Sequence, residues 1–302
     1  MILSELARTA FQEQLERMQL NLEGCIEGVD PIHLHDLRVA NRRTRVALLE
    51  FRNLLPDPVF KQYQENFRWI HKITGPVRDL DVGLSNFPVY KKKITKNWRP
   101  KLIPARELME EKRLVAQAEL AAVLRSPDVG EIFNSWSSLL EEGVLEGSEV
   151  GLESAREYGC RRIIIRFRKT REQALKIGKK TPAKKYHDFR IQVKELRYLL
   201  EFFEPVLDLD EISRVRTGLK NVQNALGAYQ DAAVQITNLT RLAEGLHQSG
   251  SGIDPFLALG QLIGVYEKEL RRCKKESRKT IRWLTSDATA REFQSCFKYP
   301  VK

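Results

Sequence analysis

Apolar residues recur at intervals of three and four along most of this chain, which is the spacing of one face of an α-helix. The alternation typical of β-strands is scarce, and its main candidate, Ile163 to Ile165, lies among charged residues that fit a helix better. The pattern therefore predicts an all-α protein. The expected helices cover residues 2–24, 32–55, 58–74, 79–93, 104–125, 128–142, 152–178, 183–204, 211–226, 230–248 and 255–284.

Prolines and glycines mark the breaks between these helices, for example at Pro56 to Pro58 and at Gly75-Pro76. Segment 86–104, with its lysine run and prolines, is expected to be an irregular basic connection. Residues 286–302 are expected to form a less ordered tail.

Two sequence blocks each occur twice at the same separation. HDLRVANRRTR begins at His35 and HDFRIQVKELR at His187, and the same offset of 152 residues separates GPVRD at Gly75 from GAYQD at Gly227. Because both blocks match in register, we interpret the chain as one helical unit used twice, packed about a pseudo-twofold axis. We expect a single domain over 1–285, with a first bundle over 1–146 and a second over 147–285.

Each repeated helix carries four histidine or basic positions in steps of three, four and three. At about 100° per residue these positions fall within a sector of about 80°, so they form one straight stripe opposite the apolar face. We call the eight residues of the two stripes the basic site. They are His35, Arg38, Arg42 and Arg45 in the first helix and His187, Arg190, Lys194 and Arg197 in the second.

Such a stripe destabilises a helix slightly, because like charges three and four residues apart repel. A merely solvated face tolerates exchange of charge, as it does beside the stripe, where Arg43 aligns with Glu195. All four stripe positions instead stay histidine or basic in both copies, which favours a ligand-facing role. Arginine, lysine and histidine donors together suit phosphate oxygens.

Overall charge points the same way. The chain has 51 Lys+Arg against 40 Asp+Glu, a net charge of +11, which favours polyanionic partners. The N-terminus is amphipathic, no apolar run reaches membrane-spanning length, and the four cysteines lack C-x-x-C spacing. We therefore expect a cytoplasmic protein with reduced thiols and no membrane partner.

With these motifs in view, the sequence resembles the CHAD family, the conserved histidine α-helical domain. The likeness covers 1–285 and is carried by the histidine motifs at 35–45 and 187–198 and by GPVRDLDV at 75–82 with its counterpart at 227–234. It implies two helical bundles around a basic groove or pore and non-catalytic binding of inorganic polyphosphate. Some relatives carry an adjoining triphosphate-tunnel domain, and we expect this chain to be a stand-alone copy without one. Association with polyphosphate granules is a further expectation.

Carried over by position, the resemblance makes the eight residues of the basic site the polyphosphate contacts. Arg78 belongs to the glycine block, but it aligns with Gln230, so we rank it second. Arg68 and Lys220 are basic at matching positions on the preceding helix and are ranked with it. No cofactor is implied.

Three other functions stay open. Asp79 and Asp81 could serve a phosphohydrolase, although both Asp79 and Asp231 are more simply helix caps or partners of arginines, and the chain lacks a P-loop and H-E-x-x-H. Metal binding by His33, His35 and His71 is disfavoured because only His35 is duplicated as a histidine.

Nucleic-acid binding is the strongest alternative, because the net charge alone gives RNA some affinity at low salt. Single-strand binders usually interleave aromatic with basic residues for base stacking, and the stripe holds no aromatic until Tyr198. The site is therefore expected to bind backbone charge rather than bases.

Overall fold

The computed structural model describes residues 1–298, and within them the chain is all-helical, with no strand beyond one isolated bridge between Ile2 and Ser154. This confirms the expected fold class. The helices of the first half are α1 (Leu3–Glu27), α2 (Pro31–Glu50), α3 (Asp57–Ile73), α4 (Gly75–Ser85), α5 (Phe87–Lys93), α6 (Ile103–Arg125) and α7 (Pro127–Glu141).

The second half contains fewer and longer helices. Its helices are α8 (Ala155–Leu175), α9 (Ala183–Phe203), α10 (Leu209–Gln248), α11 (Ile253–Thr285) and α12 (Asp287–Cys296). Short 3-10 turns follow α2 at Arg52–Leu54 and α9 at Glu204–Val206, and others lie at Lys96–Trp98, Pro100–Leu102 and Glu149–Leu152.

Helix boundaries repeat at the offset seen in the sequence. The first residues of α1, α2 and α3 each lie 152 positions before the first residues of α8, α9 and α10, and the two 3-10 turns after α2 and α9 keep the same offset. The rotational relation between the halves and the division at 146/147 remain predictions.

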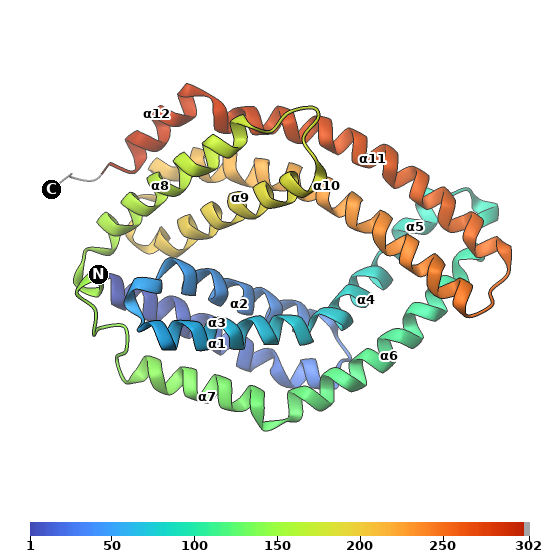
Figure 1. Ribbon diagram of the computed structural model, residues 1–302, viewed down its shortest axis with the longest axis horizontal. Helices are drawn as coiled ribbons and strands as arrows, with labels where there is room; N and C mark the ends of the chain where they lie inside the picture. The colour runs from blue at the N-terminus through green and yellow to red at the C-terminus, as the bar shows by residue number, and fades with distance from the viewer. Residues whose placement is uncertain (299–302) are drawn as a thin grey trace.

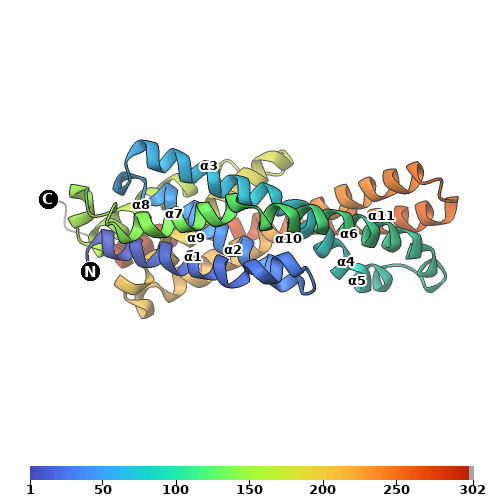
Figure 2. The ribbon, with the colours of Figure 1, turned by 90° about the horizontal axis from the view of Figure 1, so that it is seen from below.

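The molecule is flattened and elongated, with the start of α1 and the end of α12 toward one extremity (Figures 1 and 2). α2 and α9 occupy the middle in Figure 1, α6 and α7 run along one long edge, and α11 and α12 run along the other. A main core is built on large buried side chains such as Phe11, Phe51 and Trp136. A second apolar cluster joins α5 and the start of α6 to the end of α10 and the start of α11.

Buried ion pairs link the two halves beside the main core. The Glu50 carboxylate is 2 % exposed and accepts hydrogen bonds from Arg162, at 2.9 Å, and from Arg166 on α8. Arg166 also donates to Glu195 on α9 at 2.7 Å. These contacts join α2 to α8 and α8 to α9, and so help to set the positions of both stripe helices.

The expected break between 211–226 and 230–248 is wrong, because α10 runs unbroken through Gly227. In the first half the corresponding glycine precedes Pro76, whose missing N–H ends α3 and begins α4. In the second half Ala228 stands in place of that proline. One helix therefore continues where the first half has two.

Two other expectations also differ from the structure. Helix 79–93 is divided into α4 and α5, with Pro88 in the first turn of α5, and segment 86–104 contains α5 and two 3-10 turns. The expected tail contains α12, whose Phe293 is fully buried and stacks on Phe167 at 3.8 Å between ring centroids. Only its last four positions, 299–302, lie outside the described residues.

Within residues 1–298, none of the helices contains a stretch apolar and long enough to cross a bilayer.

Candidate functional site

The two stripes lie on α2 and α9, and the apolar faces opposite them are buried as the sequence indicates. Leu37 and Leu48 on α2 and Leu196 on α9 are fully buried in the main core. All the stripe residues are half-buried except His187, which is exposed. Core packing on one face therefore holds a row of partly desolvated cations on the other.

The structure brings the two stripes together at Arg42. Burial lowers the pKa of Arg190, and the positive charge of Arg42 lowers it further against the opposing effect of Asp231. Burial, with the charges of Arg190 and Arg42, lowers the pKa of Lys194 to about 8. A charge on α2 thus acts on two charges of α9, so Arg42, Arg190 and Lys194 form an electrostatic cluster that spans both stripes.

Half of the basic site has no internal partner. Within residues 1–298, Arg42, Arg45, Arg190 and Lys194 form no ion pair or side-chain hydrogen bond. The Nε atoms of Arg42 and Arg190 are also buried without an acceptor. Buried donors normally have partners, so these four side chains are suited to an anion from outside the chain.

Each stripe histidine contacts the residue 43 positions later, in the glycine block. Arg78 Nη2 donates to His35 Nδ1 at 2.9 Å, and His187 Nδ1 lies 3.1 Å from Gln230 Oε1. A guanidinium only donates, so a neutral His35 ring carries its proton on Nε2, whereas the Gln230 amide has both a donor and an acceptor and is compatible with either tautomer of His187. Contacts at equivalent positions therefore give the two histidines chemically different partners.

His35 is biased toward the neutral form. Burial lowers its pKa, and the charges of Arg78 and Arg42 lower it further, against the opposing effect of Asp36. The Nε2–H group of neutral His35 is then available as a hydrogen-bond donor. The contact of Arg78 with His35 Nδ1 places this second-rank residue beside the basic site.

Arg38 departs from the simple ligand-facing expectation. Its Nη1 donates to the His71 carbonyl and to Thr74 Oγ1, both at 2.7 Å, at the junction of α3 and α4. Burial lowers its pKa, while Asp79 raises it. Arg38 therefore joins α2 to the glycine block as well as adding charge to the site.

Sequence reasoning missed His71 as a member of this cluster. Its Nε2 lies 3.4 Å from Arg38 Nη2, and burial together with Arg38, Arg45 and Arg42 lowers its pKa to about 4. His71 is thus a neutral side chain among cations. The sequence did hold one indication of this role: His71 aligns with Gln223, so both halves have a polar residue one turn before the glycine block.

The other second-rank residues, Arg68 on α3 and Lys220 on α10, lie near the last residues of the stripes. The charge of Arg68 adds to burial in lowering the pKa of Arg45. Lys220 and Arg197 line one open cleft of about 410 Å³. Arg197 is the one stripe residue with an acidic partner in the described chain, since its Nε lies 3.0 Å from Glu201.

The duplicated aspartates are not helix caps. α4 begins at Gly75, four residues before Asp79, and Asp231 lies inside α10. Burial lowers the pKa of Arg38 and of Arg190. The negative charge of Asp79 raises the pKa of Arg38, and that of Asp231 raises the pKa of Arg190. The alternative reading, that they hold arginines in place, agrees with this arrangement.

Across the described part of the chain, no three His, Cys, Asp or Glu residues gather as metal ligands would. The chemistry at hand is a set of fixed positive charges and N–H donors. Such a set suits an extended anion with many oxygen acceptors.

Comparisons with known proteins agree with this fold. A family profile described as the CHAD domain matches residues 9–240. Among solved structures, the crystal structure of the CHAD domain from the plant Ricinus communis aligns with a TM-score of 0.77 and 25% identity, covering 93% of this chain and 92% of that one.

A second solved structure, PptA from Streptomyces chartreusis, aligns with a TM-score of 0.67 over 93% of this chain and 100% of that one. At 14% identity it supports the fold alone. No curated protein sequence matches the chain.

Proposed function

This chain belongs to the CHAD domain family, and on that premise we propose that it binds inorganic polyphosphate through the basic site without hydrolysing it. CHAD domains are associated in general with binding of polyphosphate or triphosphate. The basic site supplies the donors, and the proposal places the protein in the cytoplasm, at polyphosphate granules.

One observation carries the proposal: Arg42, Arg45, Arg190 and Lys194 are half-buried close to other cations and have no partner in residues 1–298. Holding such charges together is unfavourable while they are unliganded. A phosphate chain offers an acceptor at every unit, so a single molecule can engage several of them at once. Orthophosphate can engage only one or two.

The arrangement of aspartates supports binding rather than hydrolysis. Asp81 is buried and accepts from Arg113 Nε at 2.7 Å, whereas Asp79 is exposed and acts on Arg38. Two-metal phosphoryl chemistry needs carboxylates converging on one point. These two are engaged with different arginines.

A direct assay separates binding from hydrolysis and from nucleic-acid binding. Pure protein is incubated with long-chain polyphosphate and magnesium while bound polymer and released orthophosphate are measured, and RNA is added as competitor at physiological salt. We expect binding without phosphate release and weak competition by RNA. Steady release of phosphate would contradict the non-catalytic proposal, and displacement by equal amounts of RNA would favour a nucleic-acid ligand.

A further inference from the structure

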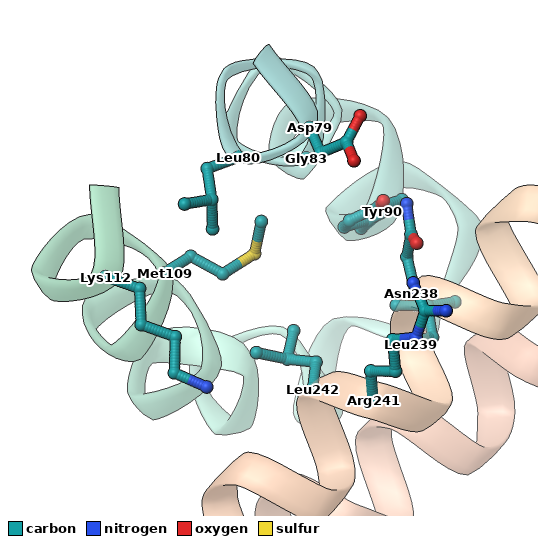
Figure 3. Close-up of a pocket in the computed structure, with 10 residues that line it drawn as sticks. All are labelled: Asp79, Leu80, Gly83, Tyr90, Met109, Lys112, Asn238, Leu239, Arg241 and Leu242. Carbon is teal, nitrogen blue, oxygen red and sulfur yellow. The ribbon is translucent and has the colours of Figure 1, made fainter. Parts of the chain in front are cut away.

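A mostly apolar cavity of about 180 Å³ lies between α4, α5, α6 and α10 (Figure 3). Leu80 on α4, Met109 on α6 and Leu242 on α10 point into it. Gly83 lets the Met109 side chain pack directly on α4, because a Cβ there would lie 2.1 Å from Met109 Cε. The main apolar wall therefore comes from three helices that are distant in sequence.

Polar groups stand around this apolar interior. Asn238 and Arg241 lie on α10, Lys112 on α6 and Asp79 on α4. In the described chain, the side chains of Asn238, Arg241 and Lys112 have no hydrogen bond or ion pair. An apolar cavity with a few free polar groups is the usual form of a small-ligand site.

This cavity lies at the histidine end of the basic site. On α4, Asp79 directly follows Arg78, the partner of His35. On α10, Asn238 follows Gln230, the partner of His187, by eight residues, or about 12 Å along the helix. α4 and α10, which contact the two histidines through Arg78 and Gln230, therefore also form two sides of the cavity.

We infer that the cavity receives the uncharged, ring-shaped end of an organic polyphosphate whose phosphates lie on the basic site, the ligand class of a nucleoside triphosphate. The inference rests on the proposed function, because the basic site holds the phosphate part. It adds that the cavity favours ligands with an organic ring over inorganic chains, which have no group to fill it.

Two features favour a ring over a phosphate end. The apolar walls formed by Leu80, Met109 and Leu242 disfavour phosphate inside the cavity, while the charged groups stand at its edge. The volume suits a flat ring system, and Arg241 and Lys112 can lie against ring faces while Asn238 offers both a donor and an acceptor to a ring edge.

The test compares adenosine triphosphate with inorganic tripolyphosphate, which has the same number of phosphates and at least as much negative charge. By calorimetry we expect the nucleotide to bind wild-type protein about tenfold more tightly, the range expected from burying part of a ring. Equal or weaker binding of the nucleotide would overturn the inference, while binding of long-chain polyphosphate would leave the proposed function intact.

Two variants locate the effect. Leu80→Trp fills the cavity from the half-buried side of α4, and Arg241→Ala removes an exposed cation from its edge. Each should reduce the preference for the nucleotide severalfold and leave tripolyphosphate binding unchanged. Arg214→Ala, an equal loss of charge on α10 outside the cavity, should change neither.

The two proposals fail in different ways. A preference for the nucleotide that survives in both Leu80→Trp and Arg241→Ala would place the organic end elsewhere and refute the cavity site. Tight nucleotide binding that depends on the cavity, without any affinity for long-chain polyphosphate, would refute the proposed function and retain the cavity.

Discussion

Arg42 is the residue at which the two halves of the basic site meet. Burial is the main effect that lowers the pKa of His35, Arg38 and His71 in the first half, and the positive charge of Arg42 lowers these pKa values further. It lowers the pKa of Arg190 and Lys194 in the second. A bound polyanion would reverse these effects, because negative charge favours the protonated forms. Ligand binding and proton uptake should therefore be coupled.

Lys194 offers the clearest test of this coupling, because its pKa in the free protein is lowered to about 8. Below pH 8 the Lys194 side chain is already charged, so its protonation should add no pH dependence to polyphosphate affinity. Above it, binding must also take up a proton, and affinity should fall by up to about tenfold per pH unit until the pKa of the bound state is reached.

The measurement is polyphosphate affinity from pH 7 to 10 for wild type and for Lys194→Arg, which stays charged throughout this range. We expect the alkaline fall to disappear in the variant. Parallel curves for the two proteins would show that Lys194 does not gain a proton on binding.

The sequence placed the stripes opposite the apolar faces of their helices, and those faces are buried in the structure, while the role of the stripes as ligand contacts stays a prediction. It missed His71 and the structural contacts of Arg38, since these depend on how the α3–α4 junction packs on α2. That packing brings together side chains more than 30 positions apart. Periodicity on a single helix carries no information about such contacts.

At the scale of elements, the helical pattern predicted the type of each long segment and was weakest at the ends. Gly227 alone indicated a break, but Ala228 can donate its backbone N–H, so α10 continues. α12 was missed because it is short. Ser286 starts it by accepting from the Thr289 N–H at 3.1 Å, and apolar packing then holds it.

α12 should contribute to stability as part of the core. Phe293 is fully buried against Phe167 and also packs near Trp283 and Phe297. We expect Phe293→Ala to lower the free energy of unfolding by about 3–5 kcal/mol in urea denaturation, whereas Gln294→Ala, exposed on the same helix, should change it little. A loss below about 1 kcal/mol for Phe293→Ala would mean that the helix is dispensable, as the tail interpretation implied.

At the scale of the whole molecule, α2 and α9 bring half-buried cations close enough to influence one another. Arg42 on α2 acts on Arg190 and Lys194 on α9, while Glu50 on α2 accepts from Arg162 and Arg166 on α8. Opposite charges therefore join the halves around Glu50, while Arg42, Arg190 and Lys194 have no acidic partner within residues 1–298. The net charge of +11 adds a general attraction for polyanions, but it does not specify where they bind.

The most direct test of the central claim reverses two charges where the stripes meet. Arg42→Glu/Arg190→Glu should weaken polyphosphate binding by roughly 100-fold or more, because each lost charged hydrogen bond is worth about 1.5–3 kcal/mol. The control is Arg125→Glu/Arg272→Glu, which makes the same change in net charge at exposed residues outside the site and should lose far less affinity. Circular dichroism and urea denaturation confirm that both proteins are folded. Equal affinities for the two folded double variants would contradict the account, because binding would then depend on total charge rather than on the basic site.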